Sequence, residues 1–323
     1  MRIFKLSFVL VICAAACGSG NNGNNGGDGG GGGGGGGDGG GGGGGGGGIF
    51  PDNNAWNTPI DTAEVDPKSA AYIASIGAGV GMHQDWSSIA GGNYGIPYVE
   101  VSGTQALVPV TFTDYPDESD PGPYPIPPDA PVEEGGDGHV LVVDRTNGFL
   151  YELYQGAKSG AGWTAANGAK WNLKTGALRP AGWTSADAAG LPIFPGLARY
   201  DEVSAGEIKH ALRFTIAKTQ KGYVAPATHA AGSCALNSDC PPMGLRVRLK
   251  ASVDVSGYPP SVQVILRALK KYGMIVADNA SSTANWYISG APNAGWNDDD
   301  LAKIKGVKGS DFEVVKTGPI TPQ

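Results

Sequence analysis

The stretch that decides the fold class is Gly135–Gln155, which reads GGDGHVLVVDRTNGFLYELYQ. Two runs of apolar, β-branched and aromatic residues flank the polar segment Arg145–Gly148. Such runs, separated by a short segment that ends in Asn-Gly, are typical of a β-hairpin. The stretch is also dense in ionisable side chains, so we expect it to organise both a sheet and a polar site.

Side-chain alternation predicts which hairpin residues share a face. In both registers considered, one face carries His139, Leu141, Val143, Leu150, Glu152 and Tyr154. A four-residue loop, Arg145–Gly148, makes His139 and Glu152 diagonal neighbours about 7–8 Å apart. A two-residue loop, Asn147–Gly148, separates them by roughly 13 Å. We favour the four-residue loop because Asp144 suits the first position of a type I turn.

Beyond the hairpin, the chain alternates short strand patterns with Gly- and Pro-rich turns. Helices are expected at 69–76 and 261–272, and strands at 96–101, 107–113, 208–217 and 244–249, with a terminal strand pair at 274–277 and 285–288 and an edge strand at 312–315. About ten short strands and one strongly amphipathic helix indicate a mainly-β domain. We expect a β-sandwich or barrel with peripheral helices, and the C-terminal part as a candidate α+β lobe.

The first 48 residues predict export and anchoring rather than a fold. Residues 1–16 have the charged, apolar and small-residue order of a signal peptide. Ala14-Ala15-Ala16-Cys17 resembles the lipobox of bacterial lipoproteins, which implies lipidation at Cys17 and attachment to a bacterial membrane, at the outer membrane or cell surface. Residues 17–48, mostly glycine, are expected to form a disordered tether, and 49–323 a single domain.

Two further segments of the domain carry a second resemblance. HALRFT at 210–215 and KYGMIVADN at 271–279 are similar to segments of a group of exported bacterial proteins. The resemblance implies an extracellular setting and supplies no activity.

Charge and cysteine content exclude some functions. The net charge is −7 and the basic residues are scattered, so nucleic acid is not an expected partner. Cys234 and Cys240 are expected to form a disulfide, because the chain is exported and few metal ligands lie near them. The loop Asp114–Ala130 has the acidic composition of a calcium loop but not EF-hand spacing, so a solvated loop without a metal is favoured and calcium is the alternative.

The ionisable residues point to acid–base chemistry. The chain has neither a G-x-S-x-G nor an H-E-x-x-H motif, which leaves histidine, tyrosine and carboxyl groups as catalysts. An exported protein rich in Trp and Tyr suits a polysaccharide, and its hydrolysis requires two carboxyl groups. The expected pairs are Asp137 with Glu152, or Asp144 with Asp278.

Other roles follow from the same interpretation. Elimination from a uronate would use His139 or Tyr154 as the base, with Asp137 at the mouth of the site. His210 and His229 are the next candidates for catalysis, and Trp86, Trp163 and Trp183 are the candidates for stacking on sugars. The alternative is a carbohydrate-binding or adhesive surface protein without catalysis, for which a flat aromatic strip would be the evidence.

Overall fold

The computed structural model describes residues 49–91, 94–280 and 285–323. Within them the chain forms fifteen strands in four sheets, with four short α-helices, so the mainly-β class predicted from the sequence is confirmed. Each sheet has two free edges in its strand order, so none of the described sheets closes into a barrel.

The largest sheet has six strands in the order β1-β13-β9-β12-β11-β14. Their bounds are β1 (His83–Asp85), β13 (Tyr287–Ser289), β9 (Leu212–Ile216), β12 (Met274–Asn279), β11 (Arg246–Leu249) and β14 (Phe312–Val314). The central pair, β9 and β12, is parallel and buried on both faces. Their apolar residues, Leu212, Phe214 and Ile216 in β9 and Met274–Ala277 in β12, are those expected of buried strands.

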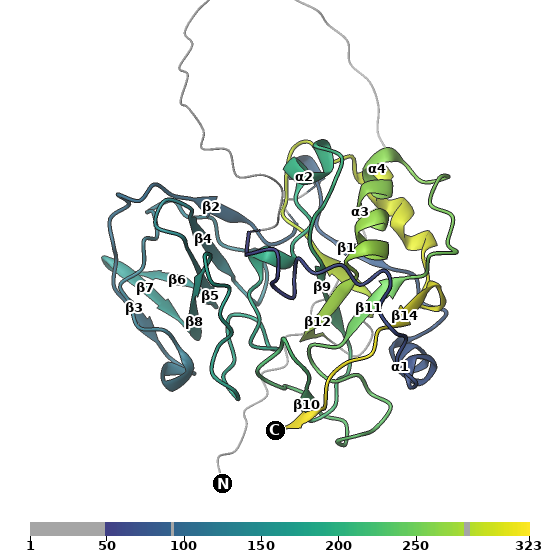
Figure 1. Ribbon diagram of the computed structural model, residues 1–323. Coiled ribbons are helices and arrows are strands. Elements are labelled where there is room, and N and C mark those ends of the chain that lie inside the picture. Colours follow the sequence, from purple (N-terminus) through teal and green to yellow (C-terminus); the bar gives the residue numbers. More distant parts are fainter. Residues whose placement is uncertain (1–48, 92–93, 281–284) are drawn as a thin grey trace, which may run out of the picture. The chain divides into compact units, whose positions relative to one another are not determined.

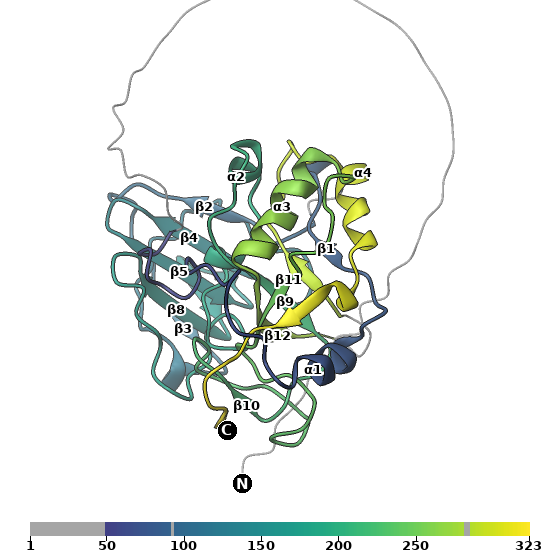
Figure 2. The same ribbon diagram turned by 45° about the vertical axis from the view of Figure 1, so that its right-hand side comes forward.

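Helices cover and border this sheet. Figures 1 and 2 show α3 (Pro260–Lys271) lying along it beside β11. The helix begins with a proline at its first position, and Gly273, with φ of +68°, follows its C-cap. The other helices are α1 (Ser69–Ile76), α2 (Tyr200–Ser204) and α4 (Asp298–Leu301). Both longer helices, α1 and α3, therefore lie where the sequence pattern predicts them.

The hairpin belongs to a second group of sheets. A four-stranded sheet has the order β2-β4-β5-β8, and a three-stranded sheet has the order β3-β7-β6. The bounds are β2 (Tyr98–Glu100), β4 (Val140–Asp144), β5 (Phe149–Tyr154), β8 (Asn167–Asn172), β3 (Val110–Phe112), β7 (Gly162–Ala165) and β6 (Ala157–Ser159), with a separate pair β10 (Gly222–Tyr223) and β15 (Thr321–Pro322). Val140 and Val142 pack into one apolar cluster with Trp163, whereas Leu141 and Val143 pack into the main core. Strand β4 is therefore buried on both faces.

The hairpin has the four-residue loop that the sequence favours. Leu141 pairs with Glu152 and Asp144 pairs with Phe149. The Asp144 carboxylate accepts hydrogen bonds from the backbone N–H of Asn147 at 2.9 Å and from its side-chain amide at 2.7 Å. The turn is therefore fixed locally by one aspartate, as expected for this residue at a turn start.

The predicted terminal strand pair is wrong. Strands β12 and β13 do not pair with each other, because β9 lies between them, parallel to β12 and antiparallel to β13. Strand β9 also begins at Leu212, so His210 precedes it. A strand pattern shows that a segment is extended but does not identify its neighbour, and here a segment about sixty residues earlier in the chain takes that place.

Candidate functional site

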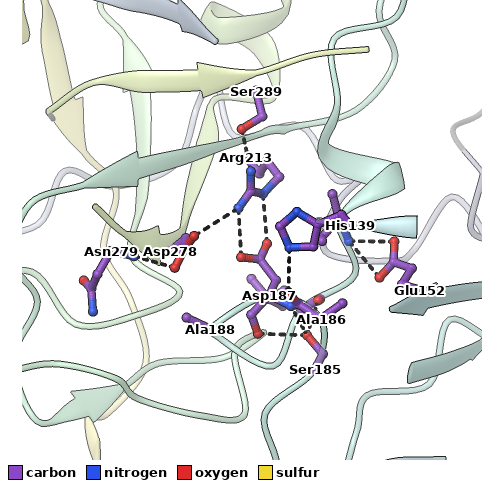
Figure 3. A network of polar contacts seen from close by, with 12 residues as sticks. His139, Glu152, Ser185, Ala186, Asp187, Ala188, Arg213, Asp278, Asn279 and Ser289 are labelled. Atoms are coloured by element: carbon purple, nitrogen blue, oxygen red, sulfur yellow. Dashed lines mark hydrogen bonds and ion pairs between the residues drawn. The ribbon is translucent and has the colours of Figure 1, made fainter. Parts of the chain in front are cut away.

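The centre of the candidate site is the buried guanidinium of Arg213 in β9 (Figure 3). Its Nε and Nη2 donate to the two carboxylate oxygens of Asp187 at 2.9 and 2.8 Å. Its Nη1 donates to Oγ of Ser289 at 2.5 Å, and Nη2 lies 3.8 Å from Oδ2 of Asp278. Arg213 and Asp187 are only 3% and 2% exposed. Two carboxyl groups therefore share one buried cation.

A bulge in β12 places Asp278 on the same face of the sheet as Arg213. Ile275 pairs with Arg213 and Val276 with Phe214, but the next pair joins Asp278 to Thr215 because the register shifts by one residue. Without this shift Asp278 would align with the following residue of β9, on the opposite face.

Asp187 is held by its own loop. Its backbone N–H donates to Oγ of Ser185 at 2.9 Å, and that hydroxyl donates to the carbonyl of Leu191 at 2.6 Å. Gly190, with φ of +67°, closes the turn and donates to the carbonyl of Asp187 at 3.0 Å. The carboxylate therefore reaches Arg213 from a preorganised turn.

Asp278 has the chemistry of a proton donor. Burial raises the pKa of its carboxyl group and the charge of Asp187 raises it further, while Arg213 opposes both, and the resulting pKa is about 7. Its side chain is 27% exposed, whereas that of Asp187 is 1% exposed. The carboxyl group that holds a proton near neutral pH is thus the one that solvent reaches.

Beside this cluster, the imidazole ring of His139 is held in its protonated form. Its Nδ1 donates to Oε2 of Glu133 at 2.5 Å, and its Nε2 donates to the carbonyl of Ala186 at 3.0 Å. Burial alone would lower the pKa of this ring, but the Glu133 carboxylate outweighs burial and raises the pKa to about 9. Because both nitrogens are engaged and the side chain is buried, His139 is better suited to positioning the loop of Asp187 than to accepting a proton.

The carboxyl group of Glu152 has a structural role. One or both of its carboxylate oxygens accept from the backbone N–H groups of Ile193 and Phe194 at 2.8–3.1 Å and from Nε1 of Trp171 at 3.0 Å. Burial raises its pKa to about 7 in spite of these hydrogen bonds. Among the described residues no hydrogen bond joins Glu152 to His139, although the two share a strand face as the parity of the hairpin predicts. The expected His139–Glu152 proton-transfer pair therefore does not form in this arrangement.

Two other expected residues lie at the exposed edge of the cluster. Asp137 is exposed, and its carbonyl accepts from the N–H of Gln155 at 2.8 Å, which extends the hairpin. The ring of Tyr154 lies 5.8 Å from that of His139. Burial, followed by the charges of Asp137 and Asp278, raises the pKa of Tyr154 to about 12. Asp137, from the first expected pair, therefore lies within electrostatic reach of Asp278, from the second.

Asp85 and Glu133 were missed as site residues by the sequence analysis. The carboxyl group of Asp85, in β1, accepts from the hydroxyl of Tyr94 and is within electrostatic reach of Arg213 and Glu133. Burial raises its pKa, against the hydrogen bond from Tyr94. Nothing in the local sequence singles out Glu133. The position of an arginine between two apolar residues, Leu212 and Phe214, is the signal that could have identified Arg213.

The remaining histidines have protein partners. His210 is 1% exposed, donates from Nδ1 to the carbonyl of Ala211 at 2.8 Å and contacts Glu202 at 3.0 Å through Nε2. His229 donates to the carbonyl of Ala188 at 2.7 Å, next to Asp187. His210 therefore belongs to the core, and His229 borders the site.

The predicted stacking tryptophans are mostly enclosed. Trp86 and Trp163 are 1% and 4% exposed, so their ring faces are covered by the protein. Trp183 is half-buried, with the Arg179 guanidinium 5.4 Å from its ring. Of these three residues, only Trp183 has a ring that a sugar can approach.

Other predictions have mixed outcomes. The Cys234–Cys240 disulfide is present, with an S–S distance of 2.00 Å. In the acidic loop Asp114–Ala130, for which calcium was the alternative, Asp120 pairs with Arg179 at 2.6 Å. Within the described residues no group of three or more His, Cys, Asp and Glu side chains could hold a metal ion, and no helix is long and apolar enough to span a membrane. The signal peptide, Cys17 and the tether lie outside the described residues.

Two cavities lie apart from the Arg213 cluster. Their volumes are about 370 and 300 Å³. The first lies between α2 and α3, and the second lies between α3 and residues 206–208, which follow α2. Both are lined by Gly206, Val264 and Arg267, and neither is lined by a residue of the cluster.

Comparison with known proteins gives no match: no protein-family model fits the chain, and no curated protein or solved structure matches it. The chemistry of the described side chains is therefore the basis for assigning a function.

Proposed function

We propose that this protein is an exported glycan hydrolase in which Asp278 is the general acid. The observation that supports the proposal is that Asp187 and Asp278 share the single guanidinium of Arg213. One cation cannot neutralise two carboxylates. Arg213 donates two hydrogen bonds to Asp187 but lies 3.8 Å from Asp278, so burial and the charge of Asp187 leave Asp278 with a proton near neutral pH. Glycoside hydrolysis needs such a carboxylic acid to protonate the leaving oxygen.

Asp137 is the proposed second carboxyl group. It is exposed, it raises the pKa of Asp278 through its charge, and no other described side chain holds it by a hydrogen bond. A carboxyl group at this place is suited to activate water or to attack the sugar. Tyr154, whose pKa is raised to about 12, remains a neutral phenol that can donate a hydrogen bond to the substrate.

Hydrolysis is favoured over elimination. Elimination from a uronate requires a base and a cation that neutralises the substrate carboxylate. Both ring nitrogens of His139 are engaged, and each nitrogen of Arg213 already donates to or pairs with a protein oxygen. A non-catalytic binding surface is less favoured because no tryptophan is among the exposed large hydrophobic residues of the described chain.

A substrate screen with three variants tests the proposal. Residues 49–323 are incubated with a polysaccharide panel, and both reducing ends and the absorbance of unsaturated products are measured. We expect reducing ends only, and a loss of about 10²–10⁴-fold in Asp278→Asn and in Asp137→Asn, the usual contribution of general acid–base catalysis. The charge-matched control is Asp129→Asn, at an exposed position in the Pro-rich loop.

The leaving group separates a general acid from a merely structural residue. Asp278→Asn should lose far less activity on an aryl glycoside with an acidic phenol than on a natural glycan, because that phenol leaves without protonation. Unchanged glycan hydrolysis in Asp278→Asn would refute its assignment, and unsaturated products would identify a lyase instead. Binding without turnover in the unmodified protein would favour the carbohydrate-binding alternative.

A further inference from the structure

The two cavities beside α3 adjoin each other and form one elongated groove. They share three lining residues, Gly206, Val264 and Arg267. The α3 residues of the groove extend from Ser261 in the first cavity to Lys271 in the second, ten positions further along the helix. At 1.5 Å per residue, the groove is about 15 Å long. The cavity volumes, about 370 and 300 Å³, are those of small-molecule sites.

The first cavity has mostly apolar walls. Val203 and Val264 are 6% and 5% exposed, and the ring of Tyr200 lies edge-on to that of Trp296, with the ring centroids 5.2 Å apart. Arg267 is the one charged residue that lines this cavity. The first cavity is therefore suited to hold the apolar part of a ligand.

The charged residues gather at the other end of the groove. Glu207, Arg267 and Lys271 line the second cavity, and Glu207 already pairs with Lys271 at 3.6 Å and with Lys209 at 3.7 Å. Arg267, in contrast, forms no ion pair with any residue in the described part of the chain. It is exposed, and its Nη1 donates to the neutral side-chain oxygen of Gln263 at 3.3 Å. The guanidinium at the junction of the two cavities is therefore available to a carboxylate.

We infer that this groove binds a free straight-chain carboxylic acid, with its carboxylate on Arg267 and its alkyl chain in the first cavity. The length of the groove favours a chain over a compact ring system, and the position of the charges sets the direction of the chain. An anionic head group is favoured because Arg267 and Lys271 face a single acid, Glu207. The groove shares no lining residue with the Arg213 cluster, so the inference is independent of the proposed hydrolase.

The test measures binding by isothermal titration calorimetry at pH 7.5 to residues 49–323, which contain every helix and strand described above. The probes are hexanoate, octanoate and decanoate, with 1-octanol and octylammonium for comparison, each below its micelle concentration. We expect one saturable site and an affinity that rises about fourfold per methylene group. Octanoate should bind about fivefold more tightly than 1-octanol, and octylammonium should not bind. An affinity independent of chain length, equal binding of octanoate and octylammonium, or no saturable binding would overturn the inference.

Three variants locate the binding in the groove. Arg267→Gln and Arg145→Gln each remove one exposed guanidinium, but only Arg267 lines the groove. We expect Arg267→Gln to bind octanoate no more tightly than 1-octanol and to keep the gain per methylene group, and Arg145→Gln to change neither. Ser204→Phe, at an exposed position on the wall of the first cavity, should fill that cavity and remove the dependence on chain length. Equal losses in Arg267→Gln and Arg145→Gln, or unchanged binding of decanoate in Ser204→Phe, would overturn the inference.

Discussion

The His139–Glu133 ion pair should make the stability of this protein depend on pH in the alkaline range. The pKa of His139 rises from 6.5 to about 9 in the folded state. A raised folded-state pKa means that the stabilisation is fully present below about pH 6.5 and is lost as the pH rises through about 9. At about 1.36 kcal/mol per unit, the shift corresponds to about 3 kcal/mol. The ring is only 4% exposed, so solvent screening reduces this value little.

The assay is urea unfolding between pH 7.5 and 9.5. About 2 kcal/mol of the His139 contribution is lost in this window, where Glu152 and Asp278, each with a pKa of about 7, are already mostly ionised. The variant His139→Gln should be less stable at pH 7.5 and should lack this pH-dependent loss. The control His229→Gln replaces a half-buried ring that has one hydrogen bond to a carbonyl, and it should retain the loss.

The test compares the loss of unfolding free energy between pH 7.5 and 9.5 in the unmodified protein with the loss in His139→Gln, because effects common to both proteins cancel. Tyrosines with raised pKa values, such as Tyr124, titrate equally in the unmodified protein and in the variant. Equal losses of unfolding free energy in the unmodified protein and in His139→Gln would show that His139 is not a buried cation. The same result would remove the basis for its positioning role.

Three further outcomes are expected. Arg213→Lys should cost about 1.5–3 kcal/mol of unfolding free energy, because lysine cannot reproduce the bidentate contact with Asp187; Arg145→Lys, at an exposed pair, should cost less than about 1 kcal/mol. Reducing the Cys234–Cys240 disulfide should lower stability by about 2 kcal/mol on the loop-entropy model, and labelling of free thiols in the unreduced, denatured protein should find neither cysteine. Membrane-extracted protein should show an acylated Cys17 by intact mass, whereas an unmodified soluble chain would contradict the lipobox interpretation.

Local patterns in the sequence were sufficient for several parts of the fold. The apolar stripe of α3 and its terminal glycine determine that helix. The β-branched runs of the hairpin determine its strands, and Asp144 determines its loop, because a turn depends on residues adjacent in the chain. The disulfide was predictable because the two cysteines are six residues apart in a chain whose first residues predict export.

The arrangement of the site depended on contacts between distant segments. Side-chain period fixes which residues of β9 share a face, but it does not select β12 and β13 as the neighbours on either side. Alternation of side chains along the hairpin correctly placed His139 and Glu152 on one face. Their hydrogen-bond partners, however, come from outside the hairpin. The partner of His139 is in the preceding loop, and those of Glu152 are in β8 and in the turn at 193–194.

The position of Asp278 shows this limit most directly. In a strand without a bulge, successive side chains alternate between the two faces of the sheet. Such alternation would place Asp278 on the face opposite Arg213. The one-residue bulge in β12 reverses that face and brings the carboxyl group to within 3.8 Å of the guanidinium. The bulge lies in the pairing of β12 with β9, a segment about sixty residues away in the chain. Only the tertiary structure could therefore bring the two residues together.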